Sequence, residues 1–217
     1  IGLETATLFQ KKGFSITNIS RRKCPLDGVQ QLSCDLSDQM AIELIEDSLI
    51  EAAKSSEYVV LVHNAARLST DTVDSATSQL RSVLELNVLA VDQLNRIVIP
   101  HMAPHSSILY VGSTLSEKAV SGCFSYVVSK HALIGMMRST CQDLKGKQIH
   151  TACICPGFTH TEMLSNHVGD HLESLAAGST FGRLVQPTEI ANTLYWTSAN
   201  QVINGSVLHA NLGQIEH

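Results

Sequence analysis

Short apolar runs alternate with stretches of helical periodicity along the chain, and this alternation restricts the fold more than any other feature. The run at 58–62 is almost continuously apolar, which is typical of a strand that helices cover on both faces. Other strands are predicted at 14–19, 29–34, 107–111, 148–155 and 206–210, and helices at 3–12, 38–54, 72–99, 126–144 and from Pro187 onward. The alternation predicts an α/β fold with a doubly wound parallel sheet between two layers of helices.

Composition narrows the class of protein. The chain of 217 residues is long enough for one domain, 1–217, with a substantial core. Its formal net charge is −5 and it has no block of basic residues, so we expect no nucleic-acid or membrane-surface partner. The six cysteines lack a CxxC spacing, as is usual for reduced thiols. No apolar run is long enough to cross a bilayer, and we predict a cytoplasmic protein.

The sequence opens directly on the predicted helix 3–12. A dinucleotide site needs a strand and a glycine-rich turn ahead of such a helix. Only the end of that turn, Ile1 and Gly2, is present here. We therefore expect a first strand and a glycine-rich turn that belong ahead of Ile1 and are missing from this sequence.

The residues best suited to catalysis lie between 113 and 130. Ser113 follows the predicted strand 107–111, at the edge where open α/β sheets bind ligands. Tyr126 and Lys130 are four residues apart at the start of a predicted helix, so they project from one face. An ammonium beside a phenol favours the phenolate, which lets the tyrosine exchange a proton near neutral pH. The Ser113 hydroxyl could then polarise a carbonyl group.

Asn87 is an amide on the apolar stripe of the predicted helix 72–99. A buried amide must find hydrogen-bond partners. A structural bond that ties down the helix and a catalytic role are equally consistent with the pattern.

The end of the predicted strand 14–19 indicates the cofactor. Ser20, Arg21 and Arg22 stand where a carboxylate would bind the hydroxyls of an adenosine ribose, whereas arginines fit a 2′-phosphate. No acidic residue lies between Ile19 and Lys23, so NADP(H) is favoured over NAD(H). Two solvated basic side chains would give the same pattern.

Two further strand ends carry candidate binding residues. Asn64 and Ala65 follow the strand 58–62, and small residues there let a ligand approach the backbone, although Asn64 could equally be a turn residue. Pro156 and Gly157 break the strand 148–155 and lead into a polar, flexible segment at 158–183, a candidate lid.

The order and spacing of these features resemble the short-chain dehydrogenase/reductase family over essentially the whole chain. The matching pieces are Ile1-Gly2, Asp35, His63-Asn64-Ala65-Ala66, Leu86-Asn87-Val88, Ser113, Tyr126-x-x-x-Lys130, Pro156-Gly157 with Thr161, and Asn204-Gly205. His63 and Ala66 depart from the family's Asn-Asn-Ala-Gly at its two ends, and Gly112 stands where the family often has a serine.

The resemblance implies a Rossmann-type oxidoreductase that transfers a hydride between NADP(H) and a carbonyl or alcohol group of a small molecule. Tyr126 would exchange the proton, Lys130 would bond the nicotinamide ribose and Ser113 would hold the substrate oxygen, while Asn87 would position a water. The implied cofactor contacts are Ile1, Gly2, Ser20, Arg21, Arg22, Asp35, Leu36, Asn64, Ala65, Tyr126, Lys130, Pro156, Gly157, Thr159 and Thr161. The resemblance also implies a homodimer or homotetramer that shares the helices at 72–99 and 126–144.

Other classes of function fit less well. A non-enzymatic dinucleotide-binding or scaffold protein would have no need of the set Asn87, Ser113, Tyr126 and Lys130. A zinc site among His160, His167 and His171 would want a fixed scaffold, and Ser113 lacks the G-x-S-x-G elbow of serine hydrolases. A relative that epimerises or dehydrates its substrate would usually carry a longer C-terminal substrate domain.

Overall fold

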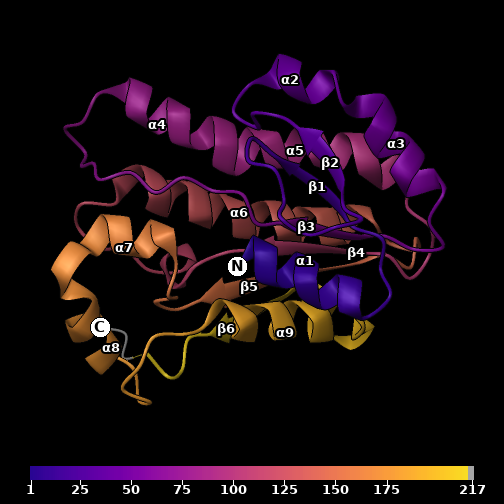
Figure 1. Ribbon diagram of the computed structural model, residues 1–217. Helices are drawn as coiled ribbons and strands as arrows, with labels where there is room; N and C mark the ends of the chain where they lie inside the picture. The colour runs from indigo at the N-terminus through magenta and orange to yellow at the C-terminus, as the bar shows by residue number, and fades with distance from the viewer. Residues whose placement is uncertain (215–217) are drawn as a thin grey trace.

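The computed structural model describes residues 1–214, and its strands form two parallel sheets (Figure 1). One sheet pairs β1 (Thr17–Ser20) with β2 (Gln30–Ser33). The other contains, in spatial order, β3 (Val60–His63), β4 (Ser107–Val111), β5 (His150–Pro156) and β6 (Ser206–Ala210). Every pair is parallel, so the carboxyl ends of β3 to β6 lie along one edge. The predicted α/β class with parallel strands is confirmed.

The sheet is divided, whereas the sequence predicted a single one. Among residues 1–214, β1 and β3 are not hydrogen-bonded to each other. In a doubly wound sheet one further strand lies between these two positions. The strand expected ahead of Ile1 would take that place, and it stays a prediction.

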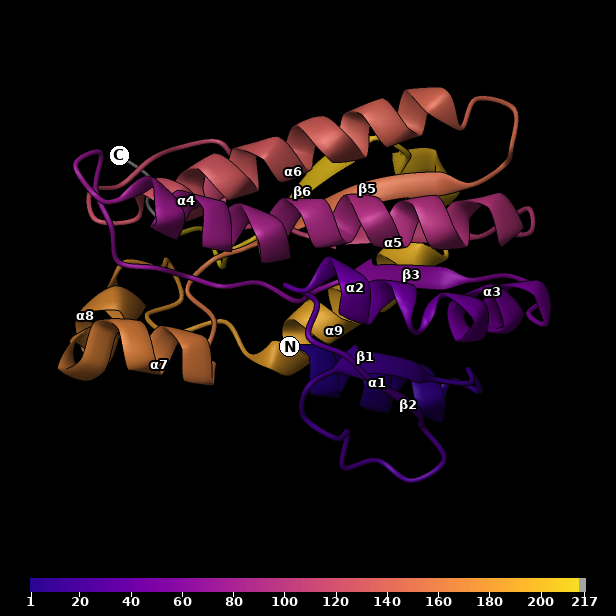
Figure 2. The same ribbon diagram turned by 90° about the horizontal axis from the view of Figure 1, so that it is seen from above.

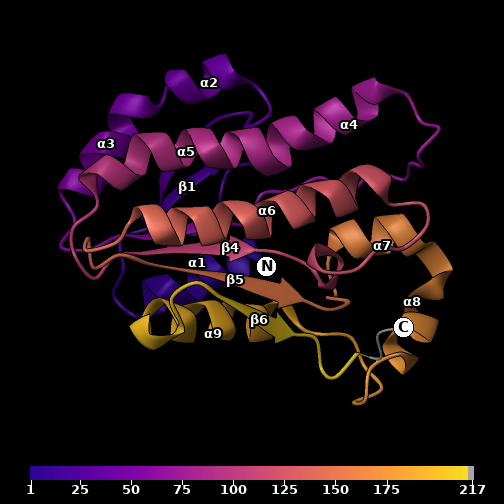
Figure 3. The ribbon, with the colours of Figure 1, turned by 180° about the vertical axis from the view of Figure 1, so that it is seen from behind.

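Helices cover both faces of the larger sheet. The helices α4 (Thr77–Leu84), α5 (Ala90–Val98) and α6 (Phe124–Asp143) lie on one face, with α4 and α5 end to end beside α6 (Figure 2). The opposite face is covered by α1 (Gly2–Lys11) and α9 (Pro187–Ser198), which pack against each other (Figure 3). The larger sheet therefore lies between two layers of helices, as the sequence predicted.

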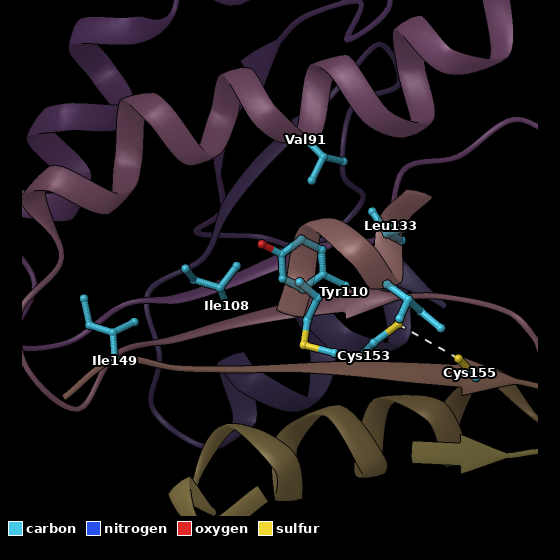
Figure 4. Packing of buried hydrophobic residues seen from close by; sticks show 9 residues of the cluster. Val91, Ile108, Tyr110, Leu133, Ile149, Cys153 and Cys155 are labelled. Atoms are coloured by element: carbon cyan, nitrogen blue, oxygen red, sulfur yellow. Dashed lines mark hydrogen bonds between the residues drawn. The ribbon is translucent and has the colours of Figure 1, made fainter. Parts of the chain in front are cut away.

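The pleat of β4 explains its unbroken apolar run. Ile108 and Tyr110 pack toward α5 and α6, together with Val91 and Leu133 (Figure 4). Leu109 and Val111 lie in the core on the other face, with residues of α1 and α9. Successive side chains point to opposite faces, and both faces are buried.

Two predicted helices are interrupted. The one at 38–54 divides into α2 (Gln39–Glu43) and α3 (Glu46–Lys54), both packed against α5. The one at 72–99 begins only at Thr77 and contains a π-helical turn, Glu85–Leu89, before α5. Apolar periodicity does not detect one added residue in a turn, and such turns are frequent at functional sites.

The segment 158–183 is more regular than predicted. It contains α7 (Glu162–Val168) and α8 (Leu172–Ala177). Within residues 1–214, no helix combines the length and apolar character needed to span a membrane. The cytoplasmic location stays a prediction.

Candidate active site

Lys130 and Tyr126 lie together at the start of α6. Lys130 is only 3 % exposed, and its Nζ donates a 2.7 Å hydrogen bond to the Val111 carbonyl at the end of β4. The same Nζ lies 5.4 Å from the centre of the half-buried Tyr126 ring. The four-residue spacing therefore places the ammonium against the phenol, as predicted.

Ser113 lies two residues beyond Val111, after β4. It caps the 3₁₀ turn Thr114–Ser116: its Oγ accepts from the Leu115 N–H at 3.1 Å, and its own N–H donates to Ser116 Oγ at 3.1 Å. This turn packs against α6. The cap uses a lone pair of the Ser113 hydroxyl, so the hydroxyl proton can still be donated to a ligand.

Two buried thiols lie directly beneath this strand end. A Cβ on Gly112 would lie 2.7 Å from Cys153 Sγ and 2.9 Å from Cys155 Sγ, so a glycine is required. The thiols are 3.9 Å apart (Figure 4). Their hydrogen bond lowers the pKa of Cys155, while the same bond and burial raise the pKa of Cys153. Both side chains are fully buried in the core beneath Gly112.

Asn87 lies in the π-helical turn with its amide fully engaged. Its Oδ1 accepts from the Arg67 N–H at 2.7 Å, and its Nδ2 donates to the Arg67 carbonyl at 3.0 Å and to Ser129 Oγ at 2.9 Å. The side chain thus ties the helix to the loop after β3 and to α6. Of the two alternatives for the side chain, the structure shows the tie; a role in positioning water stays a prediction.

The structure brings Arg21 next to Asp35 after β1 and β2. Arg21 Nη1 lies 3.7 Å from Asp35 Oδ2, and both side chains are exposed. Hydrogen bonds from the Ser37 hydroxyl and N–H, and to a lesser extent Arg21, lower the pKa of Asp35. Leu36 is half-buried beside it. The Ser20 hydroxyl donates to the Arg22 carbonyl at 2.6 Å, and Arg22 pairs with Glu162 of α7 at 3.1 Å.

The start of α1 meets the end of β3. A Cβ on Gly2 would lie 2.9 Å from Asn64 Nδ2, so the glycine lets the Asn64 amide approach the helix start closely. Ile1, the N-cap residue, makes no side-chain bond to the first turn of α1. N–H groups without a cap are suited to a phosphate. Ala65, after β3, and Arg21, after β1, are exposed. An uncapped helix start beside small residues at a strand end fits the phosphates of a nicotinamide dinucleotide.

The loop after β5 is held by the C-terminal segment. Pro156 ends the strand, and a Cβ on Gly157 would lie 2.8 Å from Asn211 Cβ and from Gln214 Oε1. Thr159 Oγ1 donates to the Gly157 carbonyl at 2.9 Å, and Thr161 caps α7. These side chains therefore shape the loop at the same sheet edge as Ser113.

One of the three histidines considered in the sequence as zinc ligands, His167, has two polar neighbours. His167 Nδ1 lies 3.3 Å from Thr70 Oγ1, and its Nε2 lies 3.8 Å from Cys123 Sγ. Among the side chains that the structure describes, no group of three or more His, Cys, Asp or Glu could hold a metal ion.

Sequence reasoning missed Asp71, a buried carboxylate that bonds to Ser125, the residue before Tyr126. The two are 54 residues apart, and no local pattern links them. The only signal was its place between a strand and a helix, where polar residues are ordinary.

Comparison with known proteins agrees with this geometry. A family model described as enoyl-(acyl carrier protein) reductase matches residues 1–214. The chain is 26 % identical over 219 residues to carbonyl reductase family member 4 of Xenopus laevis, covering 96 % of this chain and 90 % of the relative. It is 27 % identical over 222 residues to the human 3-oxoacyl-[acyl-carrier-protein] reductase, with the same coverage of each chain.

A solved structure shows the same fold. The L-sorbose reductase of Gluconobacter frateurii, in complex with NADPH and L-sorbose, superposes with a TM-score of 0.86 at 22 % identity, over 100 % of this chain and 92 % of that one. The family match, the fold and the residues at the sheet edge agree. The chain belongs to the short-chain dehydrogenase/reductase family of oxidoreductases.

Proposed function

We propose that the protein transfers a hydride between NADP(H) and a carbonyl or alcohol group of a small molecule, with Tyr126 as the general acid and base. The observation that carries the proposal is the position of Lys130. Its buried ammonium is fixed by Val111 and lies 5.4 Å from the Tyr126 ring. A buried ammonium costs free energy unless polar groups compensate it, and this cost suggests that Lys130 is kept beside Tyr126 for a purpose.

Four side chains of this protein take part in the proposed reduction. The bound cofactor supplies the hydride. Ser113, at the end of β4, donates a hydrogen bond to the substrate oxygen, and Tyr126 gives that oxygen its proton. Lys130 stabilises the phenolate that remains and bonds the nicotinamide ribose. Asn87 ties the π-helical turn to Arg67 and Ser129. From this place Asn87 would also position a water.

The remaining predicted contacts hold the cofactor. Ile1 and Gly2 at the start of α1, with Asn64 and Ala65, would receive the phosphates and the adenosine ribose. Asp35 and Leu36 would contact adenine. The loop with Pro156, Gly157, Thr159 and Thr161 would hold the nicotinamide end. These residues come from separate strand ends of parallel sheets, where ligands of such folds bind.

The preference for NADP(H) is supported by the exposed Arg21 and Arg22 after β1. A bidentate guanidinium suits a phosphate. Names of related proteins point the same way: carbonyl reductase, 3-oxoacyl-[acyl-carrier-protein] reductase, and an L-sorbose reductase solved with NADPH.

The test is a fluorescence titration of the purified full-length protein with NADPH and with NADH, followed by a panel of ketones and aldehydes. We expect tighter binding of NADPH and oxidation of NADPH with at least one carbonyl compound. Binding of neither cofactor would refute the proposal and favour a scaffold role.

A homodimer or homotetramer is part of the proposal. Leu89 after α4 is 52 % exposed, and Phe124 and Val128 of α6 are 40 % and 37 % exposed. Exposed apolar side chains on the π-helical turn and on α6 are suited to packing against a second copy of the chain. Light scattering after size exclusion measures the assembly, and a monomer would contradict this part.

A further inference from the structure

We propose that Asp71, in the loop after β3, is a positioning residue that holds the first turn of α6 and so sets the place of Tyr126. This inference rests on the role proposed for Tyr126. Asp71 does not touch the substrate oxygen in this scheme; it acts through the backbone that carries the phenol.

Asp71 bonds to the first turn of α6 with both its backbone and its side chain. Its Oδ1 accepts from the Ser125 N–H at 3.0 Å, and its Oδ2 accepts from the Ser125 hydroxyl. Its carbonyl accepts from the Phe124 N–H at 3.2 Å, and its own N–H donates to the Gly122 carbonyl at 3.1 Å. Asp71 and Cys123 also form an isolated parallel β-bridge.

This arrangement replaces a local cap. The first N–H groups of a helix have no partner within the helix. Cys123, the N-cap residue of α6, makes no side-chain bond to them. Asp71 takes that task from 54 residues away, and as a buried carboxylate at a helix N-terminus it has the favourable charge.

The capped turn is the one that carries the phenol. Phe124, Ser125 and Tyr126 are the first three residues of α6. Lys130, one turn later, is fixed separately by Val111. The relative position of Tyr126 and Lys130 therefore depends on the first turn, which Asp71 anchors to the loop after β3.

The segment 158–183 contacts the same place. His167 of α7 contacts both Thr70 and Cys123, the neighbours of Asp71 and Phe124 in the chain. Two segments, the loop after β3 and α7, thus contact the residues at the start of α6, the turn that carries Tyr126.

The test compares Asp71→Ala with Asp71→Asn, in the full chain and with a carbonyl compound from the panel above. A misplacement of about 1 Å at a reacting group costs roughly 100-fold in rate. We therefore expect Asp71→Ala to lower kcat by roughly 10- to 100-fold while KM and the Kd of NADPH change by less than about twofold. Asn keeps an acceptor for the Ser125 N–H, so Asp71→Asn should restore kcat to within about threefold.

Asn204→Ala is the matched control. Asn204 Oδ1 also accepts from a remote backbone N–H, that of Thr151, at 2.8 Å and 53 residues away. Thr151 lies near the start of β5, at the opposite end of the strand from Pro156. We expect the control to lower the melting temperature as Asp71→Ala does and to keep the wild-type kcat. An equal loss of kcat in both variants would overturn the inference.

A second readout works without turnover. The chain has four tyrosines, so ¹³C-tyrosine NMR resolves the Tyr126 ring, assigned by its absence in Tyr126→Phe. If no carbonyl compound is reduced by the wild type, the proposed function fails, and this signal still decides the positioning role. A ring signal that moves in Asp71→Ala and not in Asn204→Ala supports it, and one that moves in neither overturns it. If Asp71→Ala does not fold, Ser125→Ala takes its place, with the same reading of the signal.

Discussion

The Nζ of Lys130 lies 5.4 Å from the centre of the Tyr126 ring, and its 2.7 Å bond to Val111 fixes it independently of that ring. In the proposed reaction, an ammonium held by this backbone bond would need no rearrangement when the phenol exchanges its proton. Electrostatic stabilisation that needs no rearrangement during the reaction is the most effective kind.

Replacing Tyr126 by Phe should abolish proton transfer and leave the fold intact. Loss of a general acid typically costs 100- to 10,000-fold in rate, and we expect kcat to fall by roughly that factor. The Kd of NADPH, measured by fluorescence titration, should change little, because Lys130 is held by Val111. Undiminished turnover in this variant would rule out the proposed role.

Arg21→Ala should weaken NADP(H) much more than NAD(H). Charge-assisted hydrogen bonds contribute about 1.5–3 kcal/mol each, but Arg21 is exposed, so we expect roughly a tenfold loss for NADPH. The control is Arg96→Ala, which removes an exposed arginine that pairs with Asp92 on α5. Calorimetric titration with both cofactors measures the difference, and equal losses for the two would exclude a phosphate contact.

The sequence predicted those features that depend on residues close together in the chain. The run at 107–111 predicted β4 because both faces of that strand are buried, and the spacing of Tyr126 and Lys130 predicted their contact because i and i+4 share a helix face. The carboxyl-end position of Ser113 followed from the parallel topology.

The sequence did not predict the features that depend on contacts between distant segments or on one added residue in a helix. The π-helical turn leaves the apolar stripe intact, so periodicity alone gave one continuous helix over 72–99. The tie between Asn87 and Arg67 spans 20 residues, and the cap from Asp71 spans 54. Neither leaves a pattern in the residues next to it.

Gly112→Ala should destabilise the protein. The added methyl would lie 2.7 Å from Cys153 Sγ and 2.9 Å from Cys155 Sγ in a fully buried site. Overpacking of this kind costs about 1–3 kcal/mol. The control is Gly135→Ala in α6, where a Cβ would meet nothing within 4 Å and should stabilise the helix by roughly 0.5–1 kcal/mol. Urea unfolding at neutral pH measures both changes, and equal stability of the two variants would contradict the clash.

Replacing Cys153 by Ala tests whether a clash with its sulfur causes the loss of stability in Gly112→Ala. Cys153→Ala removes the sulfur nearest to the added methyl, so the double variant with Gly112→Ala should lose less stability than the sum of the two single changes. Strict additivity would show that the two side chains do not collide.

His63 should make the fold sensitive to acid. Burial lowers its pKa to about 4, against 6.5 in an unfolded chain, although its bond to Asn95 at 2.8 Å acts in the other direction. The unfolded state therefore binds the proton first as the pH falls. The free energy of unfolding is therefore unaffected by the protonation of His63 above pH 6.5. It falls as the pH drops from about 6.5 to 4, by roughly 3 kcal/mol in total.

Comparing His63→Asn with the wild type isolates this contribution, because the carboxylates that also titrate in this range are common to both. We expect the free energy of unfolding to fall more steeply between pH 6.5 and 4.5 in the wild type, by up to about 1.4 kcal/mol per pH unit. The exposed His131, replaced by Asn, is the matched control substitution. Urea unfolding at several pH values gives the slopes. Parallel curves for the wild type and His63→Asn would mean that His63 does not take up a proton on unfolding, and the acid sensitivity would have to come from carboxylates instead.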